Sequence, residues 1–326
     1  MDLTIAGLAF VIAALCAATM GFAIQRGATC TVAAVDEVIS QHRATKLVAL
    51  LEASLWVAGG LAVARQLQAL AQAPGGYALT GWTVAGATLL GLGAFINRAC
   101  VFGAIARLGS GEWAYVATPL GFYAGCLSVD ALFAPPQPQA LGETSVVLSA
   151  PAWFGGLVVA LFALRLASPM LRLRHTPARE LLGRQLWSPH SATSVIGLSF
   201  LAMLLLAGAW AYTDVLAELA RGMAQGLAAR AGLLACLFGG ALLGGWTAGR
   251  FRATRPRAAA LLRCFTGGLL MGWGSLLIPG SNDGLILVGM PLLRPYAWVA
   301  FATMCVVIAS ALSLQRWRAW AAPVRG

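Results

Sequence analysis

Three short stretches place a small polar side chain in the middle of an apolar run. "GFAIQRGATC" ends at Cys30, "GLGAFINRAC" ends at Cys100, and "IPGSNDG" carries Ser281 at the corresponding point. A thiol or hydroxyl at such a point is a weak, replaceable hydrogen-bond donor. A helix that begins there adds unpaired backbone N–H groups and a partial positive charge, which together bind anions. The pattern predicts anion contacts at all three breaks.

The residues beside these breaks extend the candidate site. Glycine at a break lets another backbone or a ligand approach closely. Arginine near a helix start lowers the electrostatic cost of an anion, and asparagine satisfies the freed backbone groups or binds substrate. The predicted substrate pathway comprises Arg26, Cys30, Asn97, Arg98, Cys100, Gly280, Ser281 and Asn282. A cysteine at a helix start beside arginine also has the chemistry of a nucleophile. Because no histidine is near in sequence, we assign no catalytic residue.

The elements that position these residues are membrane helices. The chain has 326 residues, of which 60% are hydrophobic and only 10% charged, and its mean hydropathy is +0.80. A soluble domain carries about 25% charged residues. We therefore expect an all-α polytopic membrane protein with about nine spans of about twenty residues each. The expected spans are 3–24, 47–64, 80–96, 113–132, 151–167, 193–213, 231–249, 264–280 and 296–314.

Three apolar segments, 31–39, 101–108 and 284–293, are too short to cross a bilayer. Segments of this kind are re-entrant half-helices, stable only where protein or a water-filled cavity surrounds them. Each begins within a few residues of one of the three breaks. The sequence therefore predicts discontinuous helices that meet inside the bundle.

The distribution of basic residues predicts the orientation. With the N-terminus outside and the C-terminus in the cytoplasm, all but four of the 22 Lys and Arg residues lie on the cytoplasmic side. The four on the outside are Arg65, Arg221, Arg230 and Arg294. Cytoplasmic loops of membrane proteins are enriched in Lys and Arg, so this layout is the favoured one.

The chain also shows an internal echo. A shift that carries Gly91 onto Gly272 also carries Gly93 onto Gly274, Gly103 onto Gly284 and Cys100 onto Ser281. In the expected topology the two copies run in opposite directions across the membrane. We therefore expect one transport domain, 1–326, whose repeat halves 1–167 and 193–315 are joined by a basic cytoplasmic loop at 168–190. Inverted repeats of this kind bind their substrates near the bilayer midplane.

The composition gives no sign of a metal, a cofactor or nucleic acid. The seven cysteines form no CxxC motif, and with three histidines they match no zinc or haem spacing. The net charge of +11 is explained by the cytoplasmic loops rather than by a nucleic-acid surface. The chain lacks a P-loop, so it does not bind ATP in that way. We expect no metal and no cofactor, and membrane lipid as surroundings.

At the three breaks the sequence resembles the YeeE/YedE family of membrane proteins, whose studied members import thiosulfate. The resemblance implies an hourglass-shaped bundle with pseudo-twofold symmetry and a central constriction lined by cysteines. It places the first two cysteines of the family at Cys30 and Cys100, whereas the third position is Ser281 here. It also implies a small soluble sulfur-carrier protein as a cytoplasmic partner. A serine hydroxyl is a harder donor than a thiol, so Ser281 favours an oxygen end of the substrate.

We therefore predict a transporter in a bacterial inner membrane that imports a small sulfur-containing anion, foremost thiosulfate, and is not an enzyme. Three alternatives stay open at this point. The substrate is another sulfur oxyanion such as sulfite; the chain is a membrane enzyme with Cys100 as nucleophile; or it is an assembly subunit of a larger complex. The oligomeric state and the driving force are not predicted.

Overall fold

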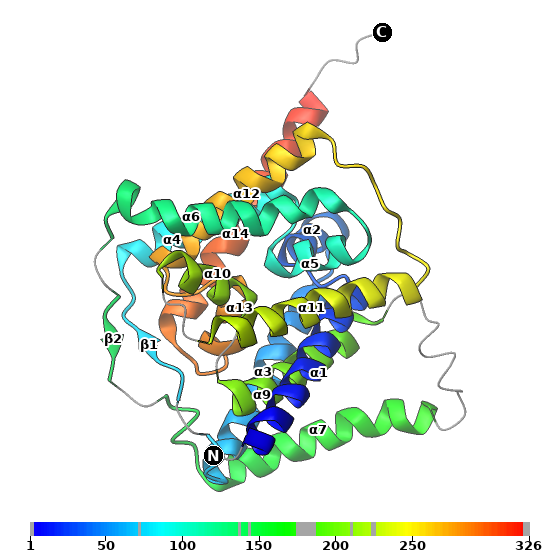
Figure 1. Cartoon of the computed structure of the whole chain (residues 1–326), viewed down its shortest axis with the longest axis vertical. Helices are drawn as coiled ribbons and strands as arrows, with labels where there is room; N and C mark the ends of the chain where they lie inside the picture. The colour runs from blue at the N-terminus through cyan, green and yellow to red at the C-terminus, as the bar shows by residue number, and fades with distance from the viewer. Residues whose placement is uncertain are drawn as a thin grey trace.

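The computed structural model describes residues 3–70, 73–135, 138–142, 145–173, 187–208, 211–222 and 226–321. The long helices are α1 (Leu3–Gly27), α3 (Thr45–Gln66), α4 (Gly81–Asn97), α6 (Ala117–Phe133), α7 (Ala152–Leu173), α9 (Pro189–Ala207), α11 (Leu227–Thr247), α12 (Ala258–Leu277) and α14 (Pro295–Ala321). The short ones are α2 (Thr31–Gln41), α5 (Val101–Gly109), α10 (Tyr212–Ala220) and α13 (Asn282–Gly284). Figure 1 shows the short helices in the middle of the bundle.

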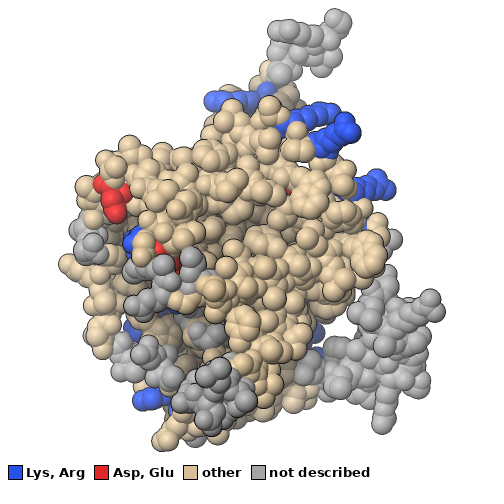
Figure 2. Space-filling model, in the orientation of Figure 1, with Lys and Arg blue, Asp and Glu red and all other residues tan. Residues whose placement is uncertain are grey.

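The predicted class, an all-α polytopic membrane protein, is confirmed. Within the described residues, eight helical segments are long and apolar enough to cross a membrane. The ninth expected span, 151–167, corresponds to α7, in which 153–165 is counted as a shorter apolar helix. A two-residue antiparallel pair of β1 (Gly76–Tyr77) with β2 (Ala140–Leu141) is the sheet of the described part. Uncharged side chains cover most of the face in Figure 2, with the charges toward its edges.

The three predicted helix starts are present. Cys30 is the N-cap of α2, Cys100 the N-cap of α5 and Ser281 the N-cap of α13, each with an extended backbone. The third short segment is less regular than expected, because α13 is one turn long and continues as a π-helical turn, η2 (Leu285–Gly289). The breaks of α1–α2, α4–α5 and α12–α13 therefore fall where the polar residues predicted them.

A fourth break was not predicted. The expected span 193–213 is present, but its predicted end is wrong, because α9 ends at Ala207 and the separate helix α10 begins at Tyr212. Gly208 follows α9 with φ of 85°, a left-handed conformation that glycine adopts without the penalty of a Cβ. The described part of the chain consequently contains four discontinuous helices, since α9–α10 joins the other three.

Close helix contacts hold the breaks together. α4 packs along α12, and α6 packs along α12 on another side. A Cβ on Gly93 would lie 2.6 Å from the Gly267 carbonyl oxygen, and one on Gly86 would lie 2.7 Å from that of Gly274. Small residues let membrane helices approach until their backbones touch, which gains van der Waals contact where lipid provides no hydrophobic drive. Glycine is therefore required on both faces of the α4–α12 contact.

The predicted basic loop 168–190 lies partly outside the described residues. α7 continues to Leu173 and α9 begins at Pro189, so the two helices enter the loop from either side. Three of the residues predicted to be cytoplasmic lie outside the described residues: Arg174, Arg179 and Arg184.

Candidate functional site

The first two breaks meet at their cysteines. The backbone N–H of Thr31 donates to the Cys100 sulfur at 3.2 Å, and the backbone N–H of Cys100 donates to the Cys30 sulfur at 3.4 Å. Both cysteines are buried free thiols, and Cys100 is 0% exposed. The start of each half-helix therefore presents its N–H groups to the thiol of the other break.

Gly103 makes this contact sterically feasible. A Cβ at Gly103 would lie 2.5 Å from the Cys30 sulfur and 3.0 Å from its Cβ. Real Cβ atoms do not approach a sulfur so closely. Gly103 and Cys30 are both buried, so neither can move aside easily. The glycine after the second cysteine therefore admits the first cysteine against the first turn of α5.

The third break joins the cysteines through Thr31. The Thr31 hydroxyl donates to the Asn282 Oδ1 at 3.2 Å. Asn282 Nδ2 and Ser281 Oγ have no hydrogen-bond partner among the described residues, although Ser281 is 1% exposed and Asn282 is 0% exposed. Leaving buried donors unsatisfied costs about 1–3 kcal/mol each. The Asn282 amide is therefore free to bind an acceptor, whereas the Ser281 hydroxyl also faces the Asp283 carboxyl.

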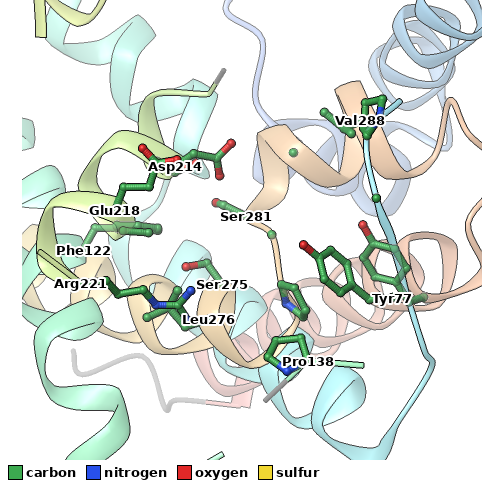
Figure 3. A pocket seen from close by; sticks show the side chains of 18 residues that line it. Tyr77, Phe122, Pro138, Asp214, Glu218, Arg221, Ser275, Leu276, Ser281 and Val288 are labelled. Atoms are coloured by element: carbon green, nitrogen blue, oxygen red, sulfur yellow. The ribbon is translucent and has the colours of Figure 1, made fainter. Parts of the chain in front are cut away.

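A cavity of about 340 Å³ opens onto the third break, and we call it the Ser281 cavity. Its walls include Gly280, Ser281, Tyr77 and Asp214. In Figure 3 the Asp214 carboxyl on α10 and the Ser281 hydroxyl point into the same space, with Tyr77 on the far side. Gly280 has φ of 149°, where L side chains are strained, so its wall position requires glycine.

A second cavity of about 500 Å³ lies against the first turn of α2, and we call it the Arg98 cavity. Arg98, Arg107 and Arg263 line it, together with Val32 and Asp36. Asp36 forms an ion pair with Arg316 at 2.7 Å, and Arg107 forms one with Glu112 at 3.2 Å. Even with these pairs, the positive charge at the wall exceeds the negative charge, so the cavity suits an anion.

Very few residues separate the two cavities. Ser281 lines the first, Val32 lines the second, and the bonded pair Asn282–Thr31 lies between them. The thiols of Cys30 and Cys100 meet at the same place, because Thr31 donates to Cys100. We call this cluster of Cys30, Thr31, Cys100 and Asn282 the plug.

Two of the predicted pathway residues are engaged elsewhere. Asn97 is buried, its amide donates to the Ala99 carbonyl at 2.9 Å, and its Oδ1 accepts from Thr118 at 3.1 Å. Asn97 therefore stabilises the turn between α4 and α5. Arg26 is 0% exposed, lines neither cavity, and donates to the Thr247 hydroxyl at 2.8 Å. α1 extends to Gly27, one turn beyond the expected end, and this places Arg26 in the contact with α11.

Reasoning from sequence missed the residues that α10 contributes. The Tyr212 hydroxyl donates to the Val101 carbonyl at 3.5 Å, and the Thr213 hydroxyl donates to Asp283 at 2.7 Å. Asp214, the next residue, lines the Ser281 cavity. Gly208, followed by the polar run Tyr212–Asp214, was the signal that could have revealed the break.

The described residues contain no group of three or more His, Cys, Asp or Glu side chains that could hold a metal ion. The groups present at the site are thiols, hydroxyls, amides and helix starts, all of which form hydrogen bonds.

Comparison with known protein families gives a match over most of the chain. The model of the family described as "Sulphur transport" matches residues 26–309, a range that includes all four breaks and both cavities' main walls. Comparison with curated proteins finds no match.

Proposed function

Because the chain belongs to the YeeE/YedE sulphur transport family, we propose that it imports a small sulfur-containing anion, foremost thiosulfate, through the plug. The observation that carries this proposal is the pair of cavities that approach the plug from two sides. A permeating anion would pass from the Ser281 hydroxyl to the thiols of Cys100 and Cys30, and then to Arg98.

The mechanism follows from the strength of the donors. Neutral thiols are weak donors, and weak sites let an anion leave as readily as it binds. Each step would replace one N–H···S or O–H···O bond of the plug by a bond to the substrate. A thiolate would repel an anion, so we expect both thiols to be protonated at rest.

We also propose that the two halves, 1–167 and 193–315, are an inverted repeat. The order α1–α2, α3, α4–α5, α6 recurs as α9–α10, α11, α12–α13, α14. The contacts recur as well, since α1 packs on α11 as α9 packs on α3, and α6 packs on α12 as α14 packs on α4. α7 would reverse the direction of the second half, and the two halves would form an hourglass around the plug.

The orientation remains a proposal supported by charge. Arg221, which the sequence places outside, lines the Ser281 cavity, whereas Arg98, Arg107 and Arg263 line the other. We accordingly propose that the Ser281 cavity faces outward and that the Arg98 cavity faces the cytoplasm of a bacterial cell. We also propose that a sulfur-carrier protein receives the imported anion on the cytoplasmic side.

The enzyme alternative is disfavoured by the position of Cys100. A nucleophilic thiolate must be accessible, and Cys100 is 0% exposed and lines neither cavity. An alkylating reagent separates the alternatives, because rapid labelling at neutral pH with a covalent substrate adduct would support the enzyme.

Uptake of radiolabelled thiosulfate by liposomes containing the purified chain tests the proposal directly. We expect uptake above that of empty liposomes, with competition by excess unlabelled thiosulfate. Separate competition by sulfite and sulfate identifies the preferred anion. Uptake no greater than that of empty liposomes would contradict transport by the chain alone and favour the assembly-subunit alternative.

A further inference from the structure

Two carboxyl groups lie beside the site at which the anion is proposed to bind. Asp214 on α10 lines the Ser281 cavity, and Asp283 follows Ser281 by two residues and is 3% exposed. Thr213 joins the two, because its hydroxyl donates to Asp283 at 2.7 Å and it directly precedes Asp214. The Ser281 hydroxyl also faces the Asp283 carboxyl, so an anion that binds at Ser281 would lie near both carboxyl groups.

Such an arrangement is unfavourable if both carboxyl groups are charged. Like charges a few ångströms apart raise each other's proton affinity, and burial does the same. Burial and the neighbouring Asp283 together raise the pKa of Asp214, which lies on a helix too short to span the membrane. An anion bound beside the two carboxyl groups adds a third negative charge. Anion binding therefore further favours protonation of the carboxyl pair.

The surroundings do not neutralise the pair by other means. Arg230 on α11 acts on Asp214 but forms an ion pair with Glu218, which faces the same cavity. Arg221 also lines the cavity, beyond the end of α10.

Four other hydroxyl or thiol groups lie near the pair. They are Tyr212 on α10, Cys126 on α6, and Tyr77 and Tyr296 on the opposite wall. None of them supplies a positive charge.

We infer that Asp214 and Asp283 form a proton-binding site beside the anion site at Ser281, and that the anion binds there together with one proton. The inference rests on the proposed function and adds a co-substrate to it. The linkage is reciprocal, since a proton that strengthens anion binding is itself bound more tightly when the anion is present.

The sign of the pH dependence follows. A carboxyl pair with raised pKa is neutral at low pH and loses its proton as the pH rises. Anion binding should therefore be strongest at low pH. It should weaken by up to about tenfold per pH unit once the pair is deprotonated in the free protein.

Isothermal titration calorimetry of the purified full chain with thiosulfate tests the inference. Titration in two buffers of different ionisation enthalpy gives both the Kd and the number of protons taken up. Between about pH 6 and about pH 8.5, we expect proton uptake that approaches one per anion and a Kd that rises with pH. Asp214→Asn should take up few protons and bind with a nearly constant Kd.

Asp130→Asn is the matched control, because it makes the same substitution at an exposed carboxyl of α6 that lines neither cavity. This variant should retain the proton uptake of the wild type. Asp283→Asn is the second test variant, because the asparagine side-chain oxygen can still accept the hydrogen bond from Thr213. The elution volume of each variant in size-exclusion chromatography verifies that it is folded.

Binding by the wild type without proton uptake, or wild-type proton uptake by Asp214→Asn, would overturn the inference and leave the proposed function standing. Absence of any thiosulfate binding by the wild type would contradict the proposed function, and the inference with it.

Discussion

The sulfur of Cys30 lies 3.4 Å from the backbone nitrogen of Cys100 and accepts its hydrogen bond. Cys100 in turn accepts a bond from the residue after Cys30, at 3.2 Å. Each sulfur thus accepts a hydrogen bond from the helix start of the opposite break. This reciprocity explains why two cysteines about seventy residues apart lie at one point.

Replacement of Cys100 by alanine should reduce thiosulfate uptake by about tenfold or more. The change removes both the thiol donor and the acceptor of the Thr31 N–H, and loss of about 1.4 kcal/mol is already a factor of ten. Initial rates of uptake by liposomes give the measurement. Cys264→Ala is the control, since Cys264 is equally buried but lies within α12. Equal rates for Cys100→Ala and the control would rule out the thiol relay.

Replacement of Gly103 by alanine should impair both stability and transport. The new Cβ would lie 2.5 Å from the Cys30 sulfur, and overpacking of this kind costs about 1–3 kcal/mol. The melting temperature in detergent and the uptake rate should both fall. Gly239→Ala is the matched control. It also replaces a helical glycine by alanine, but a Cβ at this position would have no atom within 4 Å. A wild-type melting temperature for Gly103→Ala would show that the plug is looser than described.

The residue at position 281 should set the preference between sulfur and oxygen ends of the substrate. Ser281→Cys replaces a hard donor with a soft one, so we expect the ratio of thiosulfate to sulfite uptake to rise several-fold. Ser281→Ala removes the donor and should lower uptake of both anions. Competition assays with the two anions measure the ratio. An unchanged ratio in Ser281→Cys would mean that the hydroxyl does not contact the substrate.

The arginines of the Arg98 cavity should govern the passage of the anion in a salt-dependent manner. Arg98→Gln and Arg263→Gln each remove one positive charge from the wall, and we expect several-fold slower uptake at low ionic strength, with a smaller difference at high salt. Arg318→Gln, near the exposed end of α14 and away from the cavity wall, should have little effect. Identical rates for all three variants would argue against a role for this cavity.

The sequence predicted the breaks wherever a polar residue marked them. Cys30, Cys100 and Ser281 each interrupt an apolar run and each proved to be an N-cap. The break between α9 and α10 was missed because Ala207 and Gly208 continue an apolar stretch, which hydropathy alone reads as one span. Hydropathy detects a break only if the break carries a polar side chain, whereas this one is marked by a glycine and by the polar residues four to six positions later.

The individual site residues were harder to predict, because their roles depend on which helices touch. Arg26 was expected beside Cys30 but faces Thr247 on α11. Asp214 was not expected at all, since an acidic residue just beyond an apparent span reads as a solvated loop residue. The contacts of α10 with α6 and α11 direct Asp214 into the cavity, and these contacts cannot be derived from the local sequence.

In the proposed mechanism, the hydrogen bonds of the plug would contribute to the energy of a closed state. Three neutral hydrogen bonds join the helix breaks: Thr31 to Asn282, Thr31 to Cys100, and Cys100 to Cys30. At about 1 kcal/mol net for each bond, separating all three costs about 3 kcal/mol. An open conformation would then occupy on the order of one molecule in a hundred without any ligand. If the chain transports an anion as proposed, the barrier at the plug would consist of weak bonds that the passing anion replaces one at a time.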